Sequence, residues 1–195
     1  SYLNSDDFYI PLAFEAIDSV MSRDKRIKWI TGNDAICNQK GNIVTNITPF
    51  IYDRDLIRMG FYNGKHLPFI QQESTFFSRE LLDLVDTQEL LKLKLAGDFL
   101  LWYSFAKKHD LFILPTILAA FRIHDKNQSK DIEPYLNEMN QISDVKKFDD
   151  STQKTLNYIK NNWHSEISFK AKYNDKIITW NLNTKDWNST FDSNQ

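Results

Sequence analysis

The segment AGDFLLWYSFAKKHDLFILPTILAAFRIHDKNQS, residues 96–129, places a helix directly before two short apolar strands. Apolar side chains recur at helical spacing in its first half. Gly97 marks a boundary of that helix, because glycine costs a helix interior roughly 1 kcal/mol. Residues 111–114 form an apolar run closed by Pro115, and residues 117–123 form a second extended segment. This alternation predicts an α/β fold.

The residues before this segment extend the same alternation. Residues 11–22 predict an amphipathic helix, because Leu12, Ile17, Val20 and Met21 lie near one helical face. Pro11 suits its first turn, where a missing N–H costs nothing. A helix is therefore expected before the first long strand.

Two runs, residues 28–36 and 42–47, flank the turn NQKG at 38–41 and predict a β-hairpin. Residues 53–60 (DRDLIRMG) predict a short helix that ends at its glycine. Residues 69–77 (FIQQESTFF) are apolar at both ends and polar between, which predicts a strand whose centre reaches a site.

Helical spacing resumes at residues 78–85 and again over residues 87–108. Residues 133–162 predict one or two mostly polar helices. The tail alternates apolar and polar residues around Asn174-Asp175, so a C-terminal hairpin is expected there.

Composition excludes several classes of protein. The 195 residues suit one domain, or one domain with an appendage, and 42% hydrophobic content is too high for a disordered polymer. The balance of 24 Lys and Arg against 26 Asp and Glu argues against general attraction to nucleic acid or anionic lipid. The single Cys37 excludes an internal disulfide framework and a multi-cysteine zinc site.

Neither phosphate-binding glycine loop, GxGxxG or GxxxxGK, occurs among the five glycines. No apolar run approaches the roughly 20 residues that span a bilayer, and the polar start is unlike a signal peptide. We therefore expect a cytoplasmic protein.

Adjacent carboxylates at Asp6 and Asp7 follow Asn4 at the start of the chain. Hard cations such as Mg²⁺ or Mn²⁺ prefer oxygen ligands and bridge such carboxylates to a diphosphate. The alternative is a helix N-cap, which is the commoner use of acidic residues before a helix.

Arg122 and His124 lie two residues apart, so in an extended segment their side chains project from one face. The arginine fork suits phosphate, and the imidazole suits a metal ion. A solvated strand end is the alternative.

Asp98 follows Gly97 at a predicted helix start. It is a candidate general base for an incoming hydroxyl, and a carboxylate stabilised only by the helix dipole is the alternative.

The polar run Gln71, Gln72, Glu73 and Ser74 must face solvent, a hydrogen-bond network or a ligand, because burying it without partners would cost a few kcal/mol. Amide and carboxylate groups suit hydroxyl-rich ligands such as sugars. Glu73 is a second candidate base.

The order of these motifs resembles the second half of family 2 inverting glycosyltransferases with the GT-A fold. The likeness covers about residues 2–130 and is carried by LNSDDFYIPLAFEAI, WITGNDAICNQKGNIV, IQQESTFFSREL and the segment from residue 96 to 129. It implies a partial, Rossmann-like GT-A domain over residues 1–130. Residues 131–195 would then be a helical and hairpin extension.

The resemblance implies a role for each motif. Asp6 and Asp7 match the DxD-type motif that holds Mg²⁺ or Mn²⁺ against the diphosphate of a nucleotide-diphosphate sugar donor. Asp98 matches the base that deprotonates the acceptor hydroxyl. Arg122 and His124 match an RxH segment that contacts the diphosphate and completes metal ligation.

The resemblance also implies a substrate-binding wall formed by the Gln71–Ser74 run, and it matches Trp102 to a tryptophan shortly after the base. The expected function is sugar transfer to a carbohydrate or lipid-linked acceptor in bacterial surface polysaccharide or glycoconjugate synthesis. The protein is then expected in the cytoplasm or peripherally on the inner membrane face, beside a membrane-bound assembly.

Two departures from the family pattern leave alternatives open. Gly97 replaces the glutamate that usually precedes the base, and the N-terminal half that binds the nucleotide base is missing. Without that half we expect no turnover. A non-catalytic, glycosyltransferase-like interaction module is the alternative, and a hydrolytic or phosphate-transferring enzyme is a third. Trp163, Trp180 and Trp187 in the tail suit either a small packed core or sugar platforms.

Overall fold

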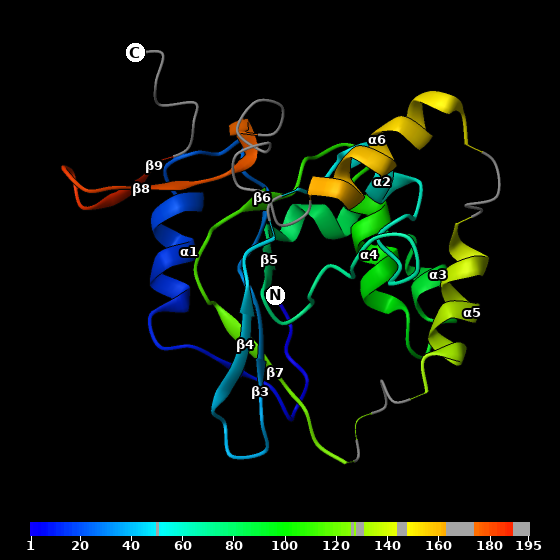
Figure 1. Cartoon of the computed structure of the whole chain (residues 1–195), viewed down its shortest axis with the longest axis horizontal. Coiled ribbons are helices and arrows are strands. Elements are labelled where there is room, and N and C mark those ends of the chain that lie inside the picture. Colours follow the sequence, from blue (N-terminus) through cyan, green and yellow to red (C-terminus); the bar gives the residue numbers. More distant parts are fainter. Residues whose placement is uncertain (50, 126, 128–130, 144–147, 163–173, 189–195) are drawn as a thin grey trace.

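Two open mixed sheets organise the chain in the computed structural model, which describes all residues except 50, 126, 128–130, 144–147, 163–173 and 189–195 (Figure 1). The four-stranded sheet has the order β1 (Phe8–Tyr9), β7 (Ala119–Arg122), β3 (Asp34–Cys37), β4 (Ile43–Ile47). The three-stranded sheet has the order β5 (Thr75–Phe77), β2 (Trp29–Thr31), β6 (Phe112–Ile113). The pairs β3–β7 and β2–β6 are parallel, and the others are antiparallel. The predicted α/β class is confirmed at this level.

The two sheets are connected by a break that the sequence pattern did not predict. Residues 28–36 form two strands, because the chain leaves β2 at Gly32 and begins β3 at Asp34. A Cβ at Gly32 would lie 2.7 Å from Leu118 Cγ and 2.8 Å from the Thr116 carbonyl oxygen. Only glycine fits where the segment before β7 crosses this break.

The predicted hairpin is confirmed between β3 and β4. Asn38 and Asn42 close its turn through a backbone hydrogen bond of 3.0 Å, and Gly41 takes a φ of +82°, a left-handed value that glycine adopts without steric cost.

Helices cover both faces of the three-stranded sheet (Figure 1). Helix α1 (Ala13–Met21) confirms the predicted helix and buries Ile17 and Val20 with Ile30 of β2. Trp29 points to the opposite face, as strand alternation requires, and packs with α4 (Gly97–Phe105). The larger core therefore lies between β2 and α4.

The remaining helices are α2 (Arg54–Arg58), α3 (Thr87–Leu90), α5 (Glu133–Ile142), α6 (Asp150–Asn162), η1 (Arg79–Leu84) and η3 (Asn174–Lys176). Helix α2 ends before Gly60, as predicted. Leu156 and Ile159 of α6 belong to the core that contains Trp29. The segment after residue 130 thus packs against the same core as the rest of the chain.

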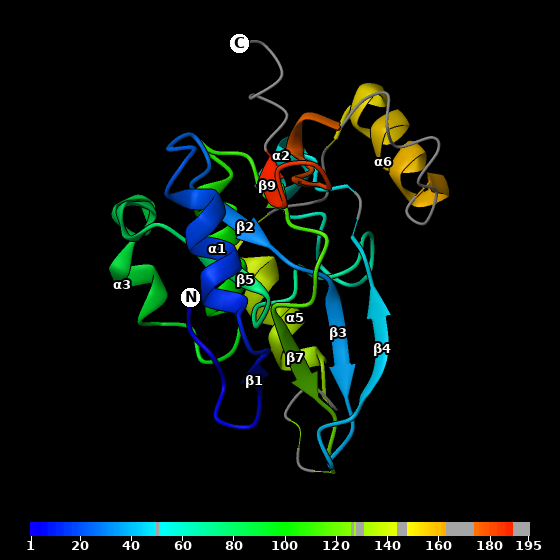
Figure 2. The ribbon, with the colours of Figure 1, turned by 90° about the vertical axis from the view of Figure 1, so that its left-hand side faces the viewer.

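A two-stranded hairpin, β8 (Thr179–Asn181) with β9 (Asp186–Asn188), lies beside α1 (Figure 2). This is not the hairpin predicted around Asn174-Asp175, because Asn174 lies in η3 and the turn of the observed hairpin follows Asn181. The first strand of the predicted hairpin falls within residues 163–173, outside the described residues. Trp180 and Trp187 pack against each other with ring centroids 5.1 Å apart. Trp163 lies outside the described residues.

Three other expectations were wrong. Gln71–Ser74 is a turn before β5 and not the centre of a strand. The interruption of the helix predicted over residues 87–108 was expected at residues 96–98 but spans Leu91 to Ala96; Gly97 is the first residue of α4, so its predicted place at a helix boundary is confirmed. Leu12 is 72% exposed, because its left-handed φ of 69° places it before the helix and outside its apolar face.

Candidate functional site

The acidic turn at the start of the chain lies against the end of β7. Strand β1 pairs with β7, which brings the preceding Asp6 and Asp7 to Arg122 and His124. His124 Nε2 donates a hydrogen bond of 2.7 Å to Asp6 Oδ2, and the Arg122 backbone N–H donates one of 2.8 Å to Asp7 Oδ1. Two motifs more than 110 residues apart in sequence therefore meet.

The two aspartates have different surroundings. Asp6 is partly exposed together with His124, and the hydrogen bond from His124 holds the pKa of Asp6 below its ordinary value. Asp7 is only 8% exposed, and burial raises its pKa. Asp6 therefore faces solvent or a ligand as an anion, and Asp7 is part of the interior.

Glu73 lies beside Asp7. Burial, with a smaller contribution from the negative charges of Asp7 and Asp98, raises the pKa of Glu73 to about 8. Asp7 Oδ2 is buried, and side-chain hydrogen bonds from Glu73 and Asn4 act to lower the pKa of Asp7 against the effect of burial. Because two neighbouring carboxylates do not both ionise readily, Glu73 holds a proton at neutral pH and shares it with Asp7.

Asp98 is the last member of this series of acidic groups and interacts electrostatically with Glu73. It lies in the first turn of α4, and Tyr135 Oη donates a hydrogen bond of 2.9 Å to its Oδ1. Burial raises the pKa of Asp98 to about 6, although hydrogen bonds from Tyr135 and from backbone N–H groups act in the opposite direction. The charge of Asp98 also contributes to the raised pKa of Tyr2 and Glu73. His124, Asp6, Asp7, Glu73 and Asp98 are thus electrostatically linked in series.

The glutamine side chains of the 71–74 turn hold the site together. Gln71 exchanges two hydrogen bonds with the Ala35 backbone, at 3.0 and 3.1 Å. Gln72 donates to the Tyr2 carbonyl oxygen and accepts a hydrogen bond of 3.2 Å from Asn4 Nδ2. Both side chains are engaged by the protein itself.

Ser74 is fully buried and donates to the Asn33 carbonyl oxygen at 3.1 Å and to Gln71 Oε1 at 2.8 Å. Like the two glutamines, it stabilises the turn. The Gln71–Ser74 run was expected to form a substrate-binding wall. Its side chains instead form hydrogen bonds within the protein and stabilise the turn that carries Glu73.

Trp102 lies in the main core and is only 3% exposed. It stacks on Trp29, with ring centroids 5.7 Å apart and an interplanar angle of 25°. Its position is that of a packing residue.

The residues around Asp6 suit a divalent cation that a ligand helps to hold. In the part of the chain that the structure describes, no three His, Cys, Asp or Glu side chains gather into a complete metal site. Asp6 and His124 nevertheless offer an oxygen and a nitrogen donor, and a cation bound by both would replace the Nε2 proton that His124 shares with Asp6. Mg²⁺ is commonly held by one or two protein carboxylates plus substrate phosphates, so two donors suffice if a diphosphate supplies the rest.

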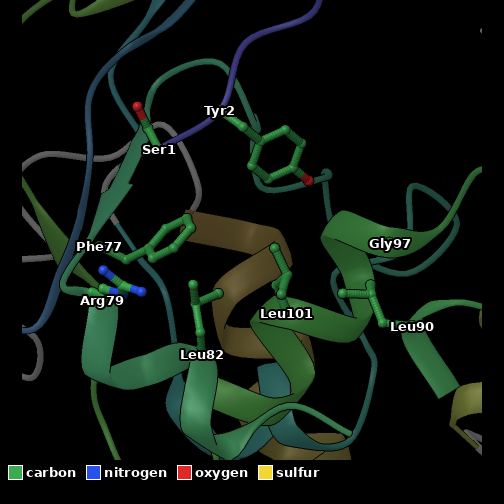
Figure 3. A pocket seen from close by; sticks show the side chains of 8 residues that line it. All are labelled: Ser1, Tyr2, Phe77, Arg79, Leu82, Leu90, Gly97 and Leu101. Carbon is green, nitrogen blue, oxygen red and sulfur yellow. The ribbon is translucent and has the colours of Figure 1, made fainter. Parts of the chain in front are cut away.

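A hollow of about 550 Å³ opens beside α4 (Figure 3). Leu82, Leu90 and Leu101 give it an apolar wall, and Gly97 completes it next to Asp98. A Cβ at Gly97 would lie 3.5 Å from Leu90 Cδ1, an ordinary van der Waals contact. Glycine is not required there by space, but it leaves the hollow wider than a glutamate would.

Three residues of the site were not predicted from the sequence: Tyr2, Tyr135 and Glu138. Tyr135 and Glu138 are three residues apart on α5 and therefore share a helix face. That spacing was visible in the sequence, but it does not identify what the face contacts.

No family model and no curated protein matches this chain. Among the helices of the described residues, none combines the length and apolar character needed to cross a membrane.

Proposed function

We propose that this chain is the second half of a metal-dependent inverting glycosyltransferase catalytic domain. The observation that carries the proposal is the electrostatic series from His124 through Asp6, Asp7 and Glu73 to Asp98, with hydrogen bonds at its His124–Asp6 and Asp7–Glu73 steps. These groups come from distant parts of the sequence, and they include an ion-binding pair and an ionised base.

Asp98 is the general base of the proposed reaction. With a pKa of about 6 it is ionised at neutral pH and still basic enough to accept a proton as one is released. The acceptor hydroxyl loses its proton to Asp98 while its oxygen attacks the anomeric carbon. The bond from that carbon to the diphosphate oxygen breaks with inversion, and Asp98 later releases the proton to solvent.

Glu73 does not compete for this role. Its pKa of about 8 keeps it protonated at neutral pH, so it cannot accept a proton there. It contributes to the site by satisfying the buried Asp7 carboxylate. Asp7 in turn holds the backbone of Arg122 at the end of β7.

Asp6 and His124 would hold the divalent cation. When bound, Mg²⁺ or Mn²⁺ neutralises charge that develops on the leaving diphosphate. Arg122 lies next to this pair and its charge contributes to the lowered pKa of Asp6, so it favours an anionic ligand at the same place. The proposed acceptor site is the hollow that Gly97 lines, because Gly97 directly precedes Asp98 in the chain.

The test uses the intact protein, meaning this chain with any nucleotide-binding half that precedes it in its natural polypeptide. Thermal unfolding is measured with uridine, guanosine and thymidine diphosphates, each with Mn²⁺ or with a chelator. We expect one diphosphate to raise the melting temperature only when Mn²⁺ is present, because a ligand of the folded state stabilises it. Asp6→Asn should remove this protection, and the exposed control Asp18→Asn should retain it.

Absence of metal-dependent protection, or equal protection in Asp6→Asn, would contradict the proposal and favour a non-catalytic module. If one diphosphate does protect, incubation of the intact protein with a nucleotide sugar that carries this diphosphate identifies the reaction. Free sugar or free phosphate released without an acceptor would indicate a hydrolytic or phosphate-transferring enzyme, whereas a glycosylated acceptor is the expected product.

A further inference from the structure

We propose that Tyr135 and Glu138 of helix α5 are positioning residues for Asp98. The inference rests on the proposed function, because it assigns them to the base of that reaction. Both residues lie in the extension after residue 130, outside the region of family resemblance. The extension then takes part in the chemistry and is more than an attachment to the catalytic part.

Tyr135 orients the base directly. Its Oη donates a hydrogen bond of 2.9 Å to Asp98 Oδ1, and backbone N–H groups at the start of α4 also donate to this carboxylate. The tyrosine ring is held in turn by Phe69, with ring centroids 5.6 Å apart in an edge-to-face arrangement. The hydroxyl therefore approaches Asp98 from a fixed direction.

Glu138 fixes the backbone from which Asp98 projects. Its carboxylate accepts hydrogen bonds from three consecutive backbone N–H groups, those of Lys94, Leu95 and Ala96, at 2.9 to 3.1 Å. Helix α4 has no side-chain cap of its own at Ala96. Glu138 thus holds the segment that leads into α4, two residues before the proposed base.

The two contacts act together because one rigid element supplies both. Tyr135 and Glu138 are three residues apart on α5, and Met139 on the same helix packs with Ala96, which precedes α4, and with Phe99 of α4. Met139 is only 2% exposed. Any displacement of α5 relative to α4 would therefore move the Asp98 carboxylate and the backbone before it at once.

The titration of Asp98 reports on these contacts. The groups that act electrostatically with Asp98 and Tyr135 are Tyr2, Glu73 and Glu138. Burial raises the pKa of Asp98, and the hydrogen bond from Tyr135 lowers it. Removing the Tyr135 hydroxyl should therefore raise this pKa and move the acidic limb of a pH–rate profile to higher pH.

Burial would also raise the pKa of Glu138, but the hydrogen bonds from Ala96, Leu95 and Lys94 outweigh it and hold the pKa below its ordinary value. Glu138 is therefore ionised throughout the range in which Asp98 titrates. Its contribution is a fixed charge, so Glu138→Gln tests positioning without adding a new titration.

The experiment measures sugar transfer by the intact protein as a function of pH for Tyr135→Phe, Glu138→Gln and Asp98→Asn. Matched controls are Tyr103→Phe on α4 and Glu133→Gln on α5, which remove the same chemical groups at positions outside these contacts. We expect Tyr135→Phe and Glu138→Gln to lower kcat about tenfold or more, as loss of a supporting contact typically does, with little change in KM. We also expect the acidic limb of Tyr135→Phe to shift upward.

Thermal unfolding of each variant separates loss of folding from loss of positioning. If Tyr135→Phe unfolds below the assay temperature, the kcat and KM of Glu138→Gln carry the test instead. Wild-type kcat and an unmoved acidic limb in both variants, with Asp98→Asn inactive, would overturn this inference and leave the proposed function intact. Full activity in Asp98→Asn would overturn both.

Discussion

Glu73→Gln tests whether the buried acid beside Asp7 carries a proton in the folded protein. Glutamine matches the protonated form of glutamate in shape, and its amide can donate to Asp7 Oδ2 as the shared proton does. The variant therefore keeps the neutral pair and removes the titration. The comparison isolates the cost of ionising Glu73 inside the protein.

The magnitude follows from the pKa of Glu73. Burial raises it from 4.5 to about 8, and each pKa unit is worth about 1.4 kcal/mol. At a pH below the pKa of Glu73 in the unfolded state, the folded and the unfolded protein both carry the Glu73 proton, and the full stability is present. As pH rises toward the folded value, the unfolded state ionises first, so the folded protein loses several kcal/mol across this window. Glu73→Gln does not lose this contribution.

The assay is urea unfolding of the 195-residue chain at intervals from about pH 5 to pH 8, with the free energy of unfolding obtained by linear extrapolation. Titrating groups that do not interact with Glu73 cancel in the difference between variant and wild type. We expect the variant to gain stability relative to wild type by several kcal/mol across this range.

Glu80→Gln is the control, because Glu80 is exposed and its bond to Lys28 lowers its pKa. Its difference from wild type should stay constant over the same range. A constant difference for Glu73→Gln as well would refute the protonated pair and, with it, the argument that Glu73 is no base.

Two further predictions concern the support of the site. Gly60→Ala should lower the free energy of unfolding by about 2 kcal/mol or more, because φ is +81° and the new Cβ would lie 2.3 Å from Ser143 Oγ; in Gly41→Ala, where φ is +82° and nothing lies within 4 Å, urea unfolding should show a smaller loss. Trp102→Phe should lower the unfolding free energy by about 1 to 3 kcal/mol and leave the KM for the acceptor unchanged, and a raised KM at unchanged stability would assign Trp102 to the substrate.

Local signals in the sequence predicted the elements that local interactions build. The β3–β4 hairpin follows from its turn residues, since Gly41 takes a left-handed φ that few other residues adopt at low cost. Helix α2 follows from Asp53, whose side chain accepts from the Leu56 backbone N–H, and from Gly60 after its end. These elements need no information from the rest of the chain.

Contacts between distant residues decided what the sequence pattern missed. The break between β2 and β3 exists because Leu118 lies against Gly32, and the 71–74 turn is held by Ala35 and Tyr2. An alternating pattern cannot reveal either partner. The same holds for Tyr135, whose place on a helix face was predictable but whose bond to Asp98 was not.

The sequence predicted most of the residues of the candidate site but not how they are arranged in space. The order of motifs named Asp6, His124 and Asp98, and the structure links them electrostatically through Asp7 and Glu73. The motifs did not distinguish the exposed aspartate of the turn from the buried one. That difference depends on burial, which the spacing of residues in a short loop does not determine.

The most direct measurement of the central proposal is sugar transfer by the intact protein carrying Asp98→Asn, with binding of the nucleotide sugar measured in the same preparation. We predict that transfer falls by at least about a hundredfold, the usual contribution of a general base, while the dissociation constant of the donor in the presence of Mn²⁺ stays within a factor of about two. Transfer at the wild-type rate in a folded Asp98→Asn protein would contradict the account.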